Sequence, residues 1–387
     1  MKRTVLSLIC ILTLLPAAHS CLNDRDSDAL AEEARQLPDM VRILTGRFER
    51  NPPRYYEMRL ARVTKELQKT PNQLDLYDDA AVAAERLHHS DAAIAWMAKK
   101  KARIGNDKEA IYRYHANLGT FLAHHWLGRK DRWNNLAEMQ QARDQIARAV
   151  EIKPDAHFNR ERYQLQVMEW LLTNPKKTLK PLSWSLHNDT DKVRQAQGLS
   201  GLIVLGAAWE SVDITDALAG SLSDQGLGKL ALIAQHRRDE LLDAGRHSIM
   251  YPMESEGEGK TERSLLDSGA YGPYGAPTVP EGVKAKFTEL RKEADAWQKE
   301  RLAYMEARFA QGKHPDTDPN FWSEWKPAEP PSLDIPGEEE AKHEEARRSW
   351  WEHNGAWVAI SVLMGVLALI ITGITLLVRW LRRRFAR

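Results

Sequence analysis

The chain has 387 residues and a formal net charge of +1, from 55 basic and 54 acidic side chains. This balance provides no global field that would attract a polyanion, so composition argues against a general nucleic-acid binder. The only cysteines are Cys10 and Cys21. A chain that begins after residue 20 therefore has no internal disulfide, and its fold must rest on apolar packing.

Residues 1–20 are typical of a secretory signal peptide. Lys2 and Arg3 precede an apolar run that is too short to span a bilayer, and Ala18 and Ser20 place small residues where a signal peptidase cleaves. Cleavage there would make Cys21 the first mature residue, the position at which bacterial lipoproteins carry their lipid. Ala18-His19-Ser20 matches a lipidation signal poorly, so a lipidated and an ordinary N-terminus both stay open.

Helical patterns dominate the next 230 residues. Apolar residues recur at helical spacing over 28–250, whereas the strict alternation typical of strands is nearly absent. We predict an all-α fold with lead-in helices in 21–54, including one near 40–45, paired helices in 55–175 and a further helical region in 176–250.

Two stretches share a pattern of small and large residues at the spacing of a helical hairpin. Small residues would let two antiparallel helices approach closely, and large ones would fill the seams between successive pairs. The second stretch is longer, which predicts an extended loop at about 127–136. The packing residues are Tyr77, Ala81, Ala84, Leu87, Ala93 and Met97 in residues 73–101, and Leu118, Gly119, Ala142, Ile146, Ala149 and Pro154 in residues 115–154.

This pattern resembles the tetratricopeptide repeat (TPR) family, and the chain is similar to secreted or membrane-anchored bacterial proteins that contain such repeats. The resemblance covers roughly residues 55–172 and implies helix pairs stacked into a superhelix with a concave groove. It also implies that the first helix of each pair lines the groove. On that basis the expected partner-binding residues are Asn72, Gln73, Tyr77, Asp78, His115 and Asn117.

Residues 251–355 are rich in proline, glycine and acidic side chains and predict a tether that contains one helix, at about 282–311. The apolar stripe of this helix begins with Phe287, Leu290 and Ala294 and then slips to other positions. A slipping stripe argues against a long coiled coil and favours docking, either onto the helical domain or onto a partner.

Residues 356–378 form an uncharged apolar run long enough to span a bilayer, and an arginine-rich tail follows in 379–387. The positive-inside bias places the tail in the cytoplasm and residues 21–355 outside it. We therefore expect a single-pass protein of the cell membrane, periplasmic in its bulk if the source is a Gram-negative bacterium. Ser361 and Gly365 form a small-xxx-small pair that permits a weak homodimer.

The sequence contains no recognisable catalytic, cofactor or metal motif. We therefore predict a non-enzymatic, membrane-anchored scaffold that binds a protein partner, without cofactors and without nucleic acid. A structural protein that associates only with itself is one alternative. An envelope enzyme with a site in 190–250 is another, since that region holds Glu210, Asp213, Asp216, His236, Arg237, Asp239 and Glu240.

Overall fold

The computed structural model describes residues 39–154, 156–173, 180–251, 261–272, 275–331 and 333. All of them belong to the first of the two units into which the chain divides, residues 1–333. Within the described residues the structure is entirely helical, which confirms the predicted all-α class there. The thirteen α-helices are α2 (Met40–Thr45), α3 (Pro53–Lys69), α4 (Leu74–Arg86), α5 (Ser90–Lys101), α6 (Lys108–Gly128), α7 (Leu136–Ile152), α8 (Arg160–Thr173), α9 (Leu182–Leu186), α10 (Lys192–Val204), α11 (Val212–Asp224), α12 (Gly228–Asp243), α13 (Glu262–Tyr271) and α14 (Glu281–Ala310).

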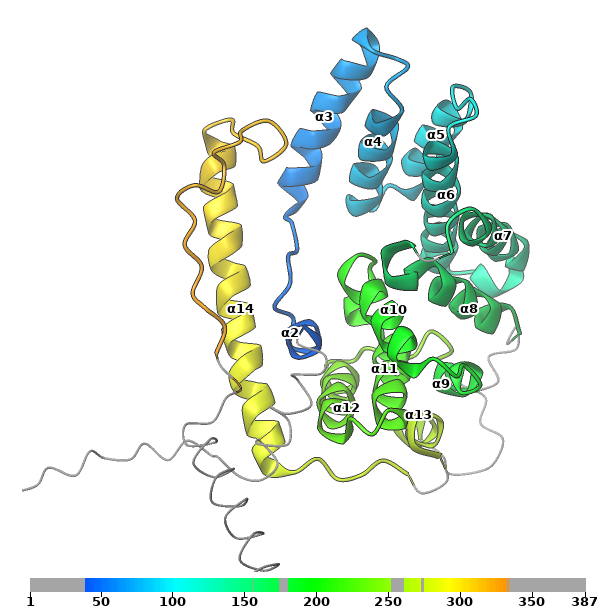
Figure 1. Ribbon diagram of the computed structural model, residues 1–387, viewed down its shortest axis with the longest axis vertical. Coiled ribbons are helices and arrows are strands. Elements are labelled where there is room, and N and C mark those ends of the chain that lie inside the picture. Colours follow the sequence, from blue (N-terminus) through cyan, green and yellow to red (C-terminus); the bar gives the residue numbers. More distant parts are fainter. Residues whose placement is uncertain are drawn as a thin grey trace, which may run out of the picture. The chain divides into compact units, whose positions relative to one another are not determined.

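The helices pack in sequential antiparallel pairs, from α3 and α4 through α6 and α7 to α11 and α12 (Figure 1). Alanines on α4 make the first contacts close, because Ala80 packs toward α3 while Ala81 and Ala84 pack toward α5 and α6. Asp107 directly precedes α6, and its Oδ1 accepts a hydrogen bond from the Glu109 N–H at 2.9 Å, which caps the helix.

The predicted long loop separates α6 from α7 and contains the short 3-10 helix η1 (Arg132–Asn134). The two helices then cross at Gly119. A Cβ added there would lie 2.7 Å from Ile146 Cγ1 and 2.9 Å from the Ala142 carbonyl oxygen. Only a glycine fits this approach without displacing the backbone of α7.

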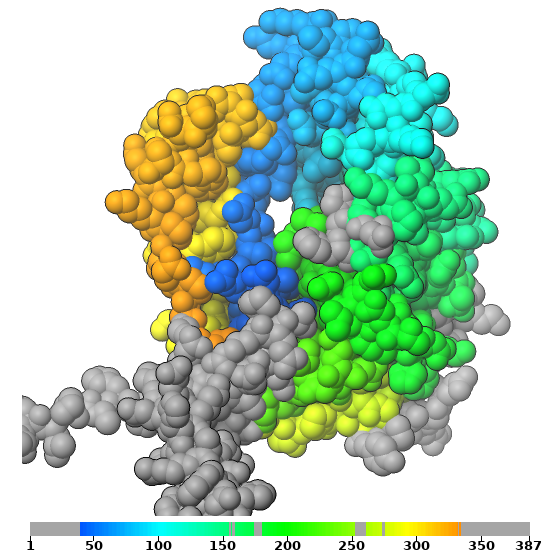
Figure 2. Space-filling view, viewed as in Figure 1, coloured from blue at the N-terminus to red at the C-terminus, as the bar shows by residue number. Residues whose placement is uncertain are grey.

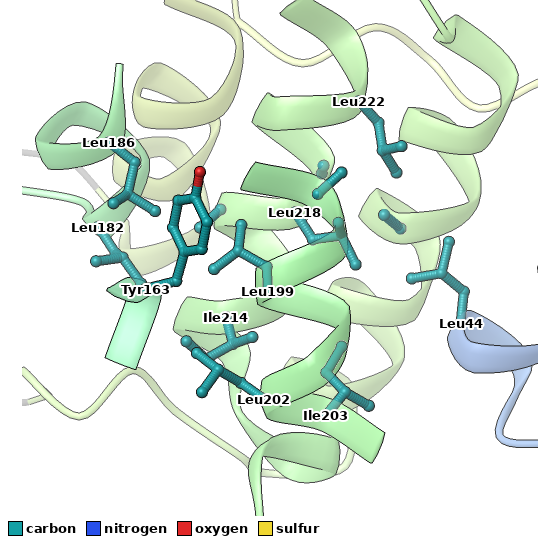
Figure 3. Close-up of a cluster of buried hydrophobic side chains, with 14 of the residues drawn as sticks. Leu44, Tyr163, Leu182, Leu186, Leu199, Leu202, Ile203, Ile214, Leu218 and Leu222 are labelled. Carbon is teal, nitrogen blue, oxygen red and sulfur yellow. The ribbon is translucent and has the colours of Figure 1, made fainter. Parts of the chain in front are cut away.

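The largest hydrophobic core of the described residues joins side chains of α6 to α12 with side chains of α2 and α14. Figure 3 shows leucine and isoleucine side chains from neighbouring helices meeting around Tyr163 of α8. The Tyr163 hydroxyl donates to Asp189 Oδ2 at 2.8 Å, so this large buried ring has its polar atom satisfied. The labelled residues are Leu44, Leu182, Leu186, Leu199, Leu202, Ile203, Ile214, Leu218 and Leu222.

Gly198 marks a second close crossing, where α10 meets Tyr163. A Cβ at Gly198 would lie 2.0 Å from Tyr163 Cδ2, and this ring atom belongs to a fully buried side chain. We expect Gly198→Ala to lower the free energy of unfolding by about 1–3 kcal/mol, at the upper end of that range. Urea unfolding of the purified chain measures this change.

Gly228→Ala is the matched control for Gly198→Ala. Gly228 is the first residue of α12, and a Cβ added there would meet nothing within 4 Å. Alanine also has the higher helix propensity, so this variant should be as stable as the natural chain or slightly more so. Equal effects of the two substitutions would contradict the proposed clash.

Helix α14 packs onto the same unit, against α2, α3 and α12 (Figure 1). The sequence left open whether this helix docks on its own helical domain or on a partner, and the structure shows docking on its own domain. Gln298 Nε2 and Arg301 Nη1 donate to the Arg50 carbonyl oxygen at 2.7 and 3.1 Å. These bonds join α14 to the segment between α2 and α3.

The residues that follow α14 return to α3. Arg59 Nε and Arg62 Nη2 of α3 each donate to Asp316 Oδ2 at 2.7 Å. His314 is buried beside them, and its Nε2 lies 3.0 Å from the Tyr55 carbonyl oxygen. In Figure 2 the orange residues of this segment accordingly lie beside blue residues of the N-terminal helices.

None of the helices in the described part of the chain is long and apolar enough to cross a membrane. The predicted signal peptide, Cys21, the apolar run of 356–378 and the arginine-rich tail all lie outside the described residues.

Candidate functional site

A row of polar contacts connects α4, α6 and α8. Arg113 Nη1 donates to Asp75 Oδ1 at 3.1 Å, and Asn117 Nδ2 donates to Asp78 Oδ1, also at 3.1 Å. Further along α6, His124 Nδ1 lies 2.8 Å from Glu85 Oε1. The residues that α6 contributes recur every three or four positions, so each helix presents a single face.

The same face continues to α8, where Gln164 Nε2 donates to Thr120 Oγ1 at 3.0 Å. We call this set the polar ladder: Asp75, Asp78, Glu85, Arg113, Asn117, Thr120, His124 and Gln164. Its members are mostly half-buried, and the Asp75 side chain is 77% exposed. The polar ladder is therefore a preformed surface whose donors and acceptors remain partly accessible.

A buried ion pair lies beneath the polar ladder. Lys100 of α5 is fully buried, and its Nζ donates to Asp78 Oδ1 and Oδ2 at 2.7 and 2.6 Å. Burial raises the pKa of the Asp78 carboxyl, while the Lys100 ammonium and the Asn117 amide oppose that rise. The pair fixes the position of α4 relative to α5 and thus the position of the ladder carboxylate.

The structure brings some of the predicted partner-binding residues together and separates others. Asp78 and Asn117 lie on the polar ladder. Tyr77 is buried against Trp96, and its hydroxyl donates to the Pro71 carbonyl oxygen at 2.9 Å. His115 faces α7, with its Nδ1 2.8 Å from Gln145 Oε1. The remaining two residues, Asn72 and Gln73, are exposed in the turn before α4.

The residues predicted for repeat packing mostly occupy buried positions. Leu87 and Leu118 are half-buried, and Pro154 is exposed after the end of α7. The others are buried in the seams between helices: Tyr77, Ala81, Ala84, Ala93, Met97, Gly119, Ala142, Ile146 and Ala149.

Sequence reasoning missed several ladder residues, namely Asp75, Glu85, Arg113, Thr120, His124 and Gln164. A signal was present, because the polar residues are spaced by three or four positions along α6 and by three and seven positions along α4. Such spacing also describes any solvated helix face. Only the contact between α4 and α6 distinguishes the ladder from an ordinary exposed surface.

The ionisable residues of 190–250 do not form one cluster. Asp216 and Asp239 accept hydrogen bonds from Arg238, and His236 packs edge-on against Phe287 with ring centroids 4.8 Å apart. Burial lowers the pKa of His236 below its ordinary value. Three others, Glu210, Arg237 and Glu240, line a pocket next to α14.

Asp213 is a buried carboxylate with fixed donors. Its Oδ1 accepts from Ser248 Oγ at 2.6 Å, and its Oδ2 accepts from the Ile249 N–H at 2.8 Å. Burial nevertheless raises the pKa of Asp213 to about 6, against the opposing effect of these bonds. These hydrogen bonds connect Asp213 of α11 to Ser248 and Ile249, which follow α12.

The raised pKa of Asp213 predicts a dependence of stability on pH. Between about pH 4 and pH 6 the folded chain retains a proton that the unfolded chain releases, so this group's contribution to stability falls as pH rises through that range. In Asp213→Asn this contribution should vanish. Free energies of unfolding measured at pH 4, 5, 6 and 7 test it, and parallel curves for the two proteins would refute the assignment.

Among the described residues, no group of three or more His, Cys, Asp or Glu side chains is placed to hold a metal ion. Comparisons of this chain with protein-family models, with curated proteins and with solved structures give no match.

Proposed function

We propose that this protein is a membrane-anchored, extracytoplasmic scaffold of the tetratricopeptide-repeat type that binds a protein partner along the polar ladder. The observation that carries the proposal is the series of side-chain hydrogen bonds that links α4 to α6 and α6 to α8, with Asp75 and Arg113 exposed at one end. A face of this kind suits an extended segment or a helix, because such a ligand presents donors and acceptors at regular intervals.

The shape around the ladder supports the same proposal. Arg86, at the end of α4, donates to the carbonyl oxygens of Leu205 and Gly206 at 2.8 and 3.0 Å, which joins α4 to the segment after α10. A polypeptide segment held there would contact several helices at once.

The proposed anchoring rests on the apolar run of residues 356–378 and on the arginines that follow it. A tail in the cytoplasm would hold the helical unit outside the membrane and raise the effective concentration of its partner near the bilayer. Protease added to intact spheroplasts should then digest the helical unit and spare an epitope at the C-terminus. Digestion of the epitope alone would reverse the proposed orientation.

A charge-removing pair of substitutions tests the binding surface. Asp75→Ala with Arg113→Ala removes the exposed Asp75–Arg113 contact of the ladder, together with the pair that Arg113 makes with Glu109 on its own helix. We expect it to reduce recovery of the crosslinked partner about tenfold, as loss of a charged contact with the partner does. Recovery from native membranes is quantified by mass spectrometry against the natural chain.

The matched control is Arg148→Ala with Glu151→Ala, which removes a comparably exposed ion pair on α7, outside the ladder. This control should leave recovery of the partner unchanged. If both pairs of substitutions reduced recovery equally, or if neither did, the polar ladder would not be the binding surface.

A further inference from the structure

A pocket of about 380 Å³ opens at the C-terminal end of α12. It is distinct from the polar ladder, since no residue belongs to both. Its walls come from α12, from α14 and from the short 3-10 helix η3 (Ala208–Glu210). Its lining includes Trp209, Glu210, Arg237, Leu241, Arg246 and Arg291.

Guanidinium groups surround the Trp209 ring on this wall. The Arg237 Cζ lies 3.9 Å from the ring centroid, and those of Arg50 and Arg291 lie 5.2 and 5.5 Å from it. Arg237 also donates from Nη2 to the Trp209 carbonyl oxygen at 3.2 Å. These arginines come from segments far apart in sequence, so the fold gathers like charges around one aromatic ring.

The carboxylates nearby do not satisfy all of these groups. Glu240 is shared, because it pairs with Arg237 and its Oε1 lies 3.4 Å from Arg291 Nε. Arg50 makes no side-chain hydrogen bond or ion pair with the described residues, and its buried Nη1 has no acceptor there. Burial, together with repulsion from Arg291 and Arg237, lowers the pKa of Arg50. Arg291 also pairs with Asp295, so the three arginines around Trp209 face two carboxylates, Glu240 and Asp295, and one positive charge is in excess.

The mouth of the pocket holds a replaceable carboxylate. Glu210 is 56% exposed at its side chain, and its Oε2 lies 2.6 Å from Nη2 of the similarly exposed Arg246. An exposed pair of this kind contributes little to stability and exchanges readily with an incoming anion. The pocket also has an apolar lining, from Leu241, Ala244 and the Trp209 ring.

From this arrangement we propose that the pocket binds an organic carboxylate with a small apolar stem. The guanidinium groups of Arg246 and Arg291 would receive the carboxylate, for which their planar fork is suited. Trp209 and Leu241 would cover the stem. Glu210 then competes with the ligand for Arg246, so removal of the Glu210 charge should strengthen ligand binding.

Benzoate and its neutral analogue benzamide test the proposal by calorimetric titration into the purified full-length chain. We expect benzoate to bind at least about tenfold more tightly than benzamide, because only benzoate gains charge-assisted hydrogen bonds. Arg291→Gln should weaken benzoate binding about tenfold. If that variant does not fold, Arg246→Gln is measured in its place, with the same expected result. Glu210→Gln should tighten it, since it frees Arg246.

Arg129→Gln is the control, because Arg129 pairs with Asp131 in the loop after α6, away from the pocket. It should leave the benzoate affinity unchanged. Equal affinities for benzoate and benzamide would overturn the proposal. Weaker benzoate binding by Glu210→Gln would also overturn the proposal. Such a result would mean that the Glu210 carboxylate helps to hold the ligand, as expected for a pocket that binds cations.

A second comparison distinguishes the two sources of such a carboxylate. A short peptide ending in phenylalanine is titrated with a free and with an amidated C-terminus. Tighter binding of the free peptide than of benzoate would identify a polypeptide C-terminus as the ligand. Binding of benzoate alone would identify a free small acid, and absence of binding by every acid would refute the site.

Discussion

Arg238→Met should be strongly destabilising. Arg238 is fully buried, and its guanidinium donates to Asp216 Oδ1 at 2.8 Å, Asp267 Oδ1 at 2.6 Å and Asp239 Oδ1 at 2.9 Å. Methionine retains much of the apolar packing but leaves Asp216 buried without a counter-charge. We expect the free energy of unfolding to fall by about 3–5 kcal/mol, measured by urea unfolding.

Arg263→Met provides the matched control for Arg238. Arg263 also pairs with Asp239, at 2.8 Å, and with Asp243, but its side chain is 41% exposed. Exposed ion pairs contribute about 0–1 kcal/mol, so this variant should be nearly as stable as the natural chain. Adding Asp216→Asn to Arg238→Met should recover part of the loss. Absence of any recovery would show that lost packing, and not the unpaired charge, is the cause.

Lys100→Met should produce a loss of similar size beneath the polar ladder. It removes the ammonium group that pairs with the buried Asp78 carboxylate, so the expected fall in unfolding free energy is about 3 kcal/mol. Asp78→Leu combined with Lys100→Met removes both charges and should restore most of that stability. A double-mutant cycle in urea isolates the interaction between the two side chains.

The stability of the Lys100→Met variant should also depend on pH, and it should increase as the pH falls. Burial raises the pKa of Asp78, and the variant lacks the ammonium group that opposes this rise. The folded state of the variant then binds a proton where the unfolded state does not, so its stability rises as pH falls from 7 toward 5. A stability deficit that stayed constant over this range would contradict the assignment.

Local patterns predicted several elements closely. The helix expected near 40–45 is α2, Met40–Thr45, and the helix expected at about 282–311 is α14, Glu281–Ala310. The helix periodicity and the turn residues that define such bounds lie within a few residues of one another, so a single sequence contains the information. The extended loop between α6 and α7 is another local feature of this kind.

The candidate sites depend on contacts that no local pattern describes. The polar ladder needs Arg113 to meet Asp75, and the pocket needs Arg291 to reach the Trp209 ring. Polar residues at helical spacing are equally compatible with a plain solvated face, so the sequence alone could not select these residues. The sequence showed that residues 190–250 are rich in charged side chains. It could not show which of them form buried ion pairs and which line a pocket.

The sequence by itself determined the all-helical class of the described chain, the helix pairs and the small residues at their crossings, because these follow from spacing within one or two turns. Tertiary structure alone decided which charges are buried and which are shared. Arg238 meets Asp267, and Arg59 meets Asp316 across more than 250 positions. Such partners are selected by the packing of whole helices, and their energies depend on the burial that this packing creates.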